Sequence, residues 1–265
     1  MRERDPAGWE AWQPAEWPAP ARVHAGHTLR SGGVSLGPWG DHAGGGGLNL
    51  GAHCGDNPAS VAENRRRLAA RLPGEPVWLE QVHGVRVHRA GSAGGTAAIA
   101  ATDASVTDQA GVVLAVLSAD CLPVLLSNRE GTVVGAAHAG WRGLAGGVIE
   151  AMVTAARGLA APAAQWLAWL GPAIGPQSFE VGDEVREAFV ARSPRAAAAF
   201  EAGRAAGKWQ ADLFLLARQR LADLGIESVY GGERCTAGNP ERSYSYRRDR
   251  ITGRLASLVW IESAD

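Results

Sequence analysis

Three residues of types that bind soft metal ions occur in the sequence, each beside glycine or other small residues. They are His83, Cys121 and His138. Imidazole and thiolate groups are good ligands for a borderline-soft ion such as zinc, and small neighbours let the backbone and a substrate approach. Three protein ligands leave a fourth tetrahedral position for water, which is typical of a catalytic zinc. The residue types therefore indicate a catalytic metal centre.

The spacing of these residues leaves other interpretations open. The sequence contains no CxxC, HExxH or H-x-H pattern, so no short motif fixes the ligands. A single histidine near a strand end is often a hydrogen-bonded structural residue, and a single cysteine in an apolar context is often part of the core. A structural zinc in a nucleotide- or precursor-binding regulator is a further alternative, in which Cys54 or Cys235 would supply a fourth ligand.

Buried strands are predicted shortly before two of the three residues. The apolar run 112–117 leads to Cys121, and the run 132–137 leads to His138. Continuous apolar runs of this length are typical of buried strands, and functional loops commonly follow the strands of a rigid scaffold. Further strands are predicted at 76–79, 85–87, 124–126, 166–170, 226–230 and 255–261.

Helices are predicted from capping residues and apolar spacing. The first begins at Asp56-Asn57-Pro58, where a capping side chain precedes a first-turn proline. Others are predicted after His138, from about residue 183, and over 211–224. The mixture lacks the regular alternation of a doubly wound sheet or a barrel, so we expect an α+β fold. Residues 1–265 are expected to form a single domain, with residues 1–20 as a peripheral N-terminal segment.

Composition excludes several classes of function. The chain has 265 residues with 26 Lys and Arg against 27 Asp and Glu, so it lacks the basic surface expected of a nucleic-acid-binding protein. No apolar run is long enough to cross a membrane, and the N-terminus lacks the apolar core of a signal peptide. We therefore expect a cytoplasmic protein. Three cysteines without a secretory signal argue against a disulfide framework.

Ordered motifs along nearly the whole chain resemble those of a known bacterial family. The strongest are Ala119-Asp120-Cys121-Leu122-Pro123 and Ala137-His138-Ala139-Gly140-Trp141-Arg142-Gly143. The others are Gly32-Gly33-Val34-Ser35, Leu48-Asn49-Leu50-Gly51, Glu63-Asn64-Arg65, Gln81-Val82-His83-Gly84, Thr102-Asp103-Ala104, Gly171-Pro172-Ala173-Ile174-Gly175-Pro176, Phe179-Glu180-Val181, Cys235-Thr236, Ser245-Tyr246-Arg247-Arg248-Asp249 and Thr252-Gly253-Arg254. The chain resembles the laccase-like multicopper polyphenol oxidase family, whose members are also described as purine nucleoside phosphorylases and peptidoglycan editing factors.

The resemblance implies a fold, a metal centre and an activity. The fold would be a four-layer α/β/β/α sandwich with mixed sheets. His83, Cys121 and His138 would bind Zn²⁺, and Cu²⁺ could occupy the same site because copper outcompetes zinc at most nitrogen sites. The implied activities are phosphorolysis of adenosine, inosine, guanosine and methylthioadenosine, and deamination of adenosine. Some members carry a cysteine where this chain has Gln177 and Ser178, so no thiol role is assigned there.

Each implied reaction needs further residues. Zinc deaminases use a carboxylate to move protons, and Asp120, beside Cys121, is the candidate; the alternative is a structural carboxylate that binds backbone amides. Phosphorolysis needs donors for phosphate, for which the arginine fork is suited. The candidates are Arg142, Arg65, Arg247, Arg248 and the neutral donor Asn49. The expected partners are a small-molecule nucleoside and phosphate, with neither nucleic acid nor membrane; the oligomeric state is open.

Two rival enzyme hypotheses use the same residues. In a cysteine hydrolase acting on a peptidoglycan-precursor amide, Cys121 would be the nucleophile and His138 or His83 its base. In a copper-dependent polyphenol oxidase, the histidines would bind copper. Multicopper oxidases generally need many histidines with paired H-x-H elements, and this chain has seven histidines, none so paired. We therefore favour the zinc-dependent purine nucleoside phosphorylase.

Overall fold

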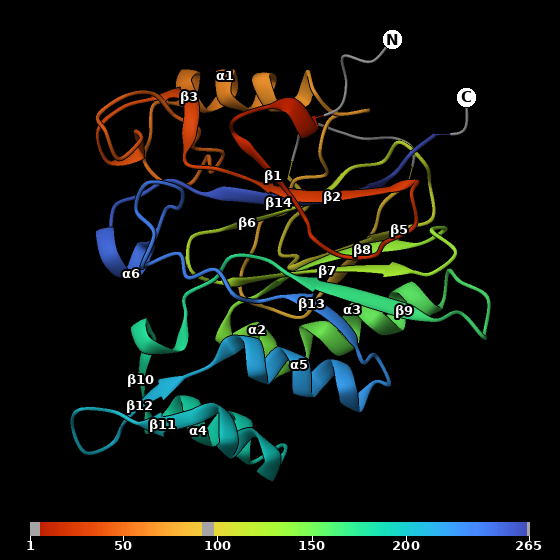
Figure 1. The fold of residues 1–265 in the computed structure, drawn as a ribbon, viewed down its shortest axis with the longest axis vertical. Helices are drawn as coiled ribbons and strands as arrows, with labels where there is room; N and C mark the ends of the chain where they lie inside the picture. The colour runs from red at the N-terminus through yellow and green to blue at the C-terminus, as the bar shows by residue number, and fades with distance from the viewer. Residues whose placement is uncertain (1–5, 92–97, 264–265) are drawn as a thin grey trace.

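Two β-sheets form the centre of the computed structural model, which describes residues 6–91 and 98–263 (Figure 1). The first is antiparallel. Its strand order is β1 (Trp12–Pro14), β2 (Val23–Thr28), β14 (Leu255–Ile261), β6 (Leu114–Ser118). The second is mixed. Its order is β13 (Ser228–Gly231), β9 (Trp166–Leu170), β7 (Leu122–Asn128), β8 (Val134–Ala139), β5 (Ala104–Thr107), β4 (Val87–Arg89).

The two sheets pack face to face because their strands carry apolar residues on both faces. In β7, Leu125 joins the core between the sheets, whereas Val124 and Leu126 join the core beneath the helices. Successive side chains of a strand point to opposite faces, so one apolar run serves two cores. This explains why the strand is completely buried.

Helices cover the outer faces of both sheets (Figure 1). α1 (Pro58–Ala69) packs Leu68 against the outer face of the antiparallel sheet. α2 (Trp141–Gly146), α3 (Val148–Arg157) and α5 (Leu213–Asp223) pack against the outer face of the mixed sheet. The predicted cap of α1 is confirmed: Asn57 accepts a hydrogen bond from the Ala59 amide, and Pro58 opens the helix.

A third, smaller sheet lies beyond these helices (Figure 1). It contains β10 (Glu180–Gly182), β12 (Lys208–Ala211) and β11 (Phe200–Ala202), and α4 (Asp183–Val190) packs beside it. The remaining named elements are β3 (Ser31–Ser35), α6 (Tyr246–Asp249) and 3₁₀ turns at Pro6–Gly8, Gly37–Trp39, Pro176–Ser178 and Pro194–Ala199. The α+β class is confirmed. The four-layer count stays a prediction, since this third sheet adds to the two central ones.

Several predicted elements have different bounds in the structure. The helix predicted after His138 is two helices, because Gly147 adopts φ +103° between α2 and α3. The segment 76–79 forms isolated bridges from Val77 and Leu79 rather than a strand, and the strand predicted at 85–87 is β4 two residues later. Of the expected peripheral segment 1–20, residues 1–5 lie outside the described ranges, and Trp12 is buried in edge strand β1.

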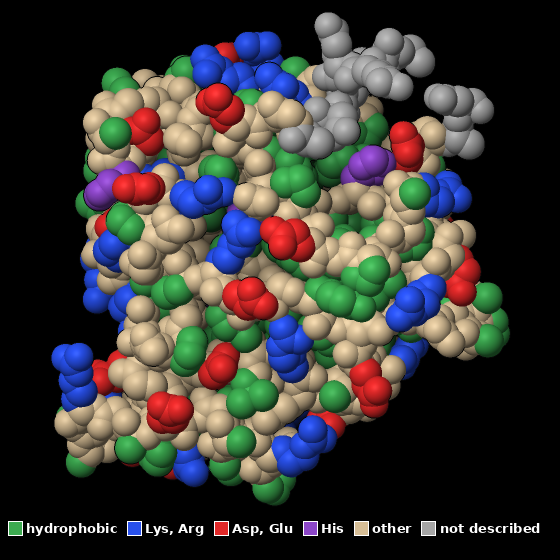
Figure 2. Space-filling view, viewed as in Figure 1, with side chains coloured by type: hydrophobic (Ala, Val, Ile, Leu, Met, Phe, Trp, Pro, Cys, Tyr) green, Lys and Arg blue, Asp and Glu red, His purple; other side chains and the backbone are tan. Residues whose placement is uncertain are grey.

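The surface in Figure 2 carries basic and acidic side chains interspersed with each other. This pattern accords with the near-zero formal net charge of −1. Among the described residues, no helix has the length and apolar character needed to cross a membrane.

Candidate metal centre

The three predicted ligands meet at one end of the mixed sheet. Their donor atoms lie within 4.8 Å of one another, and Cys121 Sγ is 3.6 Å from His83 Nε2. β7 and β8 are antiparallel neighbours with Pro123 opposite His138, which brings Cys121, just before β7, beside the end of β8. The predicted grouping of His83, Cys121 and His138 is therefore present in the structure, and it could hold a metal ion.

One candidate ligand, and the residue before another, have backbone in the left-handed region. His83 has φ +61°, and Asp120, which precedes Cys121, has φ +98°. This region is uncommon for residues other than glycine and persists where the surroundings fix it. Strain at these two positions marks the turns that present the ligands.

A buried carboxylate that the sequence analysis did not select orients His138. Asp103 Oδ1 lies 2.9 Å from His138 Nδ1, so a proton on Nδ1 is donated to the carboxylate and Nε2 is left for a metal. Burial raises the pKa of Asp103, but hydrogen bonds from His138 and Gly84 outweigh it and the pKa is lowered. The motif Thr102-Asp103-Ala104 contained this residue, yet nothing in its spacing connected it to His138.

Cys121 and His138 each shift the pKa of the other toward its charged form. Burial raises the pKa of Cys121, but the charge of His138 and hydrogen bonds from His138 and His83 lower it to about 6. Burial lowers the pKa of His138, but the Cys121 thiolate and the hydrogen bond to Asp103 raise it to about 9. A thiolate beside imidazole nitrogens is the donor set that zinc prefers.

Gly140 leaves the space that the ligands occupy. A Cβ at this position would lie 2.7 Å from His83 Cδ2 and 2.9 Å from Cys121 Sγ. The backbone there has φ −60° and ψ 157°, which any residue adopts. The requirement for glycine is therefore steric, and it comes from the side chains of His83 and Cys121.

A cavity of about 350 Å³ opens beside the three ligands. Its lining consists of His53, Gln81, His83, Leu117, Ser118, Ala119, Cys121, His138, Arg142, Tyr246 and Arg254. Arg142 is the one predicted phosphate-binding residue in this lining; its guanidinium lies 4.4 Å from the Trp141 ring centroid. Arg254, Tyr246 and His53 were not selected from the sequence, although Arg254 and Tyr246 occur in the motifs quoted above.

Four other predicted phosphate-binding residues hold the backbone around the cavity. Asn49 accepts from the Arg254 amide and donates to Asp56. Arg65 donates to the Leu50 carbonyl and lies over the Trp78 ring.

The other two arginines of this set lie on α6. Arg247 donates to the carbonyls of Ser178 and Glu180. Arg248 pairs with Asp249 and donates to the carbonyls of Thr236, Ala237 and Ser243. None of the four lines the cavity, so the structure brings only Arg142 of the predicted set to the ligands.

Asp120 also has its carboxylate engaged. Oδ1 accepts from the Thr236 hydroxyl at 2.6 Å, and Oδ2 accepts from the Arg247 amide at 2.6 Å. Both donors belong to the C-terminal region of the chain. Asp120 therefore links α6 to the turn that carries Cys121. This geometry is that of the structural alternative; the proton-transfer role stays a prediction.

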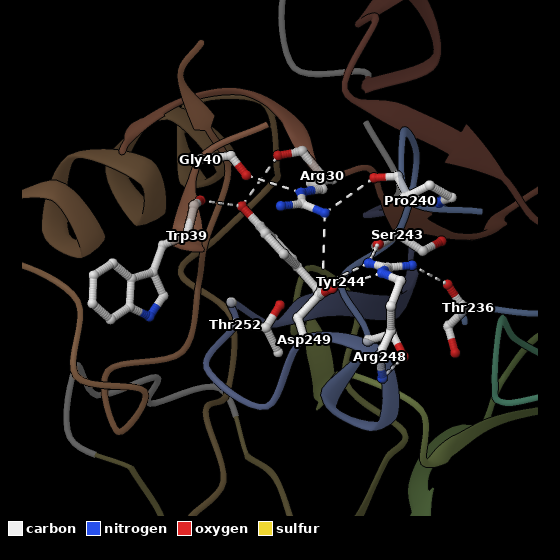
Figure 3. Close-up of polar contacts among 12 residues, drawn as sticks. Arg30, Trp39, Gly40, Thr236, Pro240, Ser243, Tyr244, Arg248, Asp249 and Thr252 are labelled. Atoms are coloured by element: carbon white, nitrogen blue, oxygen red, sulfur yellow. Dashed lines mark hydrogen bonds and ion pairs between the residues drawn. The ribbon is translucent and has the colours of Figure 1, made fainter. Parts of the chain in front are cut away.

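A buried polar network supports the segment that carries Tyr246 (Figure 3). Arg30 donates to the carbonyls of Gly40 and Pro240 and lies 3.8 Å from Asp249. The Tyr244 hydroxyl donates to the Trp39 carbonyl at 2.5 Å. These contacts fix α6 against the loop that follows β3.

The other two cysteines lie apart from the ligands. Cys235 accepts from the Gly175 amide at 3.2 Å and lies near Ser178, and Cys54 packs against Gly51. Within the residues that the structure describes, the group of possible ligands contains three members. This is the number expected of a site with an open position.

Comparisons with known proteins find close similarity over nearly the whole chain. A family model described as "Multi-copper polyphenol oxidoreductase laccase" matches residues 24–262. The chain is 53% identical over 248 residues to the purine nucleoside phosphorylase YfiH of Escherichia coli, covering 93% of this chain and 97% of that protein. It is 51% identical over 252 residues to a purine nucleoside phosphorylase of Pseudomonas aeruginosa, covering 95% and 99%.

Solved structures show the same fold. A Neisseria meningitidis protein matches with a TM-score of 0.86 and 46% identity, covering 96% of this chain and 100% of that one. YlmD from Geobacillus stearothermophilus matches with a TM-score of 0.87 and 33% identity, covering 98% and 100%.

Proposed function

The chain belongs to the family described as multi-copper polyphenol oxidoreductase laccase, and on that premise we propose that it is a zinc-dependent purine nucleoside phosphorylase. Relatives about half identical to it carry the name purine nucleoside phosphorylase. The observation that supports the proposal most is one cavity lined by the three candidate metal ligands and by Arg142 and Arg254.

His83, Cys121 and His138 are proposed to hold the zinc ion, with Asp103 fixing the His138 ring. A zinc ion bound there supplies a Lewis acid that polarises a substrate oxygen and lowers the pKa of bound water. Copper would fit the same nitrogen and sulfur donors, so metal analysis of the purified protein is the first measurement.

Arg142 and Arg254 are proposed to hold phosphate beside the ribose. Arg254 Nη1 is anchored on the carbonyls of Thr252 and Gly253, and the Arg142 side chain is exposed and stacked on Trp141. In phosphorolysis, a phosphate oxygen bonds to the ribose C1′ while the bond from C1′ to the purine nitrogen breaks. Two arginines at the cavity wall favour that geometry because guanidinium groups bind phosphate through charge-assisted hydrogen bonds.

Tyr246 is proposed to receive the purine. Its side chain is 51% exposed, although most aromatic side chains of the described residues are buried or partly buried. It stands at the cavity on α6, which Asp120 and Ser245 fix through the amides of Arg247 and Arg248. Stacking of a base on an aromatic ring contributes roughly 1–3 kcal/mol.

The test of the phosphate site is phosphate-dependent release of hypoxanthine from inosine. Arg142→Ala and Arg254→Ala are expected to raise the KM for phosphate at least about tenfold, since a lost charged hydrogen bond is worth roughly 1.5–3 kcal/mol. Arg89→Ala is the matched control, because Arg89 forms an exposed pair with Asp108 away from the cavity. Release of base at the same rate without phosphate would contradict phosphorolysis.

Deamination of adenosine is proposed as a second activity of the same cavity. The open position of a three-ligand site and the space for a purine support it. The measurement is formation of inosine and ammonia from adenosine in phosphate-free buffer. Absence of both products with fully metal-loaded protein would remove this activity while leaving the phosphorylase proposal intact.

A cysteine hydrolase acting on a peptidoglycan precursor is the alternative favoured by one observation. The lowered pKa of Cys121 beside His138 is that of an activated thiol. Complete removal of metal separates the two functions, because it should abolish phosphorolysis and leave a thiol nucleophile active. The alternative of a copper-dependent polyphenol oxidase is tested by measuring polyphenol oxidation with copper-loaded protein.

A further inference from the structure

The Asp103 carboxylate contacts both histidine ligands at once. Asp103 is fully buried immediately before β5. Its Oδ1 accepts from the His83 amide at 2.9 Å and lies 2.9 Å from His138 Nδ1. Its Oδ2 accepts from the amides of Val82 at 3.1 Å and Gly84 at 2.7 Å. One side chain therefore binds three consecutive amides and an imidazole.

These four hydrogen bonds act on different parts of the two ligands. At His138 the carboxylate fixes the ring and its tautomer, and the Asp103 carbonyl also accepts from the His138 amide at 2.7 Å. At His83 it fixes the backbone, in which φ is +61°. An isolated chain avoids this conformation, so the carboxylate has to keep the His83 turn in place.

The opposite side of the His83 turn is closed by α2. A Cβ at Gly143 would lie 3.0 Å from the Gly84 carbonyl oxygen, so helix and turn are already in close contact. The turn is held between the carboxylate on one side and the helix on the other. Its position relative to His138 then depends on Asp103 Oδ1, the atom that both ligands share.

We propose that Asp103 is a positioning residue that sets the distance between His83 and His138, so that the site is formed before metal binds. The proposal rests on the metal centre of the proposed function and adds the residue that preorganises it. It assigns Asp103 no contact with substrate. The three ligands are then held in position by different residues. The positions of His83 and His138 depend on Asp103, whereas the position of Cys121 depends on Asp120 and the turn before β7.

The test uses metal-free full-length protein titrated with Zn²⁺ against a chelating indicator. Asp103→Asn keeps the size of the side chain, but its NH₂ group cannot accept hydrogen bonds from the Val82 and Gly84 amides. The zinc Kd is expected to rise by about 10- to 100-fold, the range for residues that orient metal ligands. Asp212→Asn is the control, because Asp212 accepts an amide hydrogen bond at the start of α5 and should leave the Kd unchanged.

Cobalt substitution gives a readout that a general loss of stability would not produce. In the cobalt-loaded Asp103→Asn protein, the charge-transfer absorption band between the Cys121 thiolate and Co²⁺ is expected to persist, because Asp103 does not contact Cys121. The ligand-field bands are expected to shift, because His83 and His138 move. Loss of the thiolate band together with the ligand-field bands would contradict the proposal.

A double-mutant cycle tests whether Asp103 acts through His138. Asp103→Asn should weaken zinc binding less in a His138→Cys background, which keeps a metal ligand but removes the Nδ1 atom that contacts Asp103, than in the unmodified chain, since one of its two routes has been removed. An equal effect in both backgrounds, or an unchanged Kd in Asp103→Asn, would overturn the proposal. If Asp103→Asn does not fold, Asp103→Glu, which keeps the charge and moves the oxygens, takes its place in both measurements.

These outcomes are separable from failure of the proposed function. A protein that binds zinc through Asp103-positioned ligands but releases no base from inosine would leave the positioning role intact and remove the phosphorylase. A protein that is an active phosphorylase but whose zinc Kd does not change in Asp103→Asn would remove the positioning role and leave the phosphorylase intact. A chain that binds no metal would overturn both.

Discussion

The three candidate ligands are proposed to bind the metal, whereas the residues around them stabilise the fold. His83 is exposed, Cys121 is half-buried, and the buried His138 ring has a polar partner in Asp103, so truncating one of the three removes little apolar core packing. Cys121→Ala and His138→Ala are expected to abolish zinc binding and turnover while the protein keeps its secondary structure. Metal content and circular dichroism check this. A fully active, metal-free Cys121→Ala protein would disprove the metal mechanism.

His27 is a second histidine whose environment has a measurable consequence. It is 3% exposed in β2 and stacks on Trp169. Burial, and then the charges of Arg234 and Arg242, lower its pKa to about 3. Since the folded pKa lies below the unfolded value of 6.5, the unfolded chain binds the extra proton. Stability therefore falls as the pH drops below about 6.5, and the loss continues down to about pH 3.

Replacing His27 with a ring that does not titrate should reduce this loss. Between pH 7 and pH 5 the unmodified chain should lose about 2 kcal/mol more stability than His27→Phe. Urea unfolding at the two pH values measures the difference, and comparison between variants cancels the contribution of the metal centre. His42→Phe, in an exposed loop, is the control. Parallel pH profiles for the unmodified chain and His27→Phe would contradict the assignment.

At the scale of elements, the start of α2 limits the volume around the ligands. Gly140→Ala places a methyl group against His83 and Cys121 without straining the backbone. We expect weaker zinc binding by at least about tenfold, corresponding to roughly 1.4 kcal/mol, with little change in the metal-free melting temperature. Gly8→Ala is the control, since no atom lies within 4 Å of its added Cβ. Unchanged zinc affinity in Gly140→Ala would show that the donors are not fixed as described.

At the scale of the whole molecule, the C-terminal segment closes the site by packing against the N-terminal loops. Tyr244 is fully buried; its ring contacts Gly253 and its hydroxyl reaches Trp39. Burial raises its pKa above the usual range, so it remains a neutral donor. Through these contacts, segments some 205 residues apart in the chain support Arg254 at the cavity wall.

Tyr244→Phe tests this long-range support. Removing the hydroxyl leaves the Trp39 carbonyl without its donor, and we expect a loss of about 1–3 kcal/mol in unfolding free energy. The KM for phosphate should rise as well, because Arg254 follows the segment that Tyr244 packs against. Tyr230→Phe is the control, since among the described residues the Tyr230 hydroxyl has no hydrogen-bond partner and the side chain is only partly buried. Equal stability of Tyr244→Phe and Tyr230→Phe would contradict this account.

The sequence alone predicted the α+β class, the strands on either side of the candidate ligands, and the grouping of His83, Cys121 and His138. The strands could be predicted because apolar runs mark β6, β7 and β8 locally, whereas the grouping of the three residues was predicted from ordered motifs that resemble those of a known family. The sequence missed β10, β11 and β12, which are short and lack a continuous apolar run. It also joined α2 to α3, because the pair Gly146-Gly147 between apolar positions does not reveal the positive φ of Gly147.

Only the tertiary structure decided what the remaining polar residues do. Arg65, Arg247 and Arg248 bind backbone carbonyls, whereas Arg254, not selected from the sequence, lines the cavity. Asp103 lies 35 residues from His138 along the chain and 2.9 Å away in space. The role of a charged side chain depends on the partner that folding brings close to it, and that partner cannot be predicted from the neighbouring residues in the sequence.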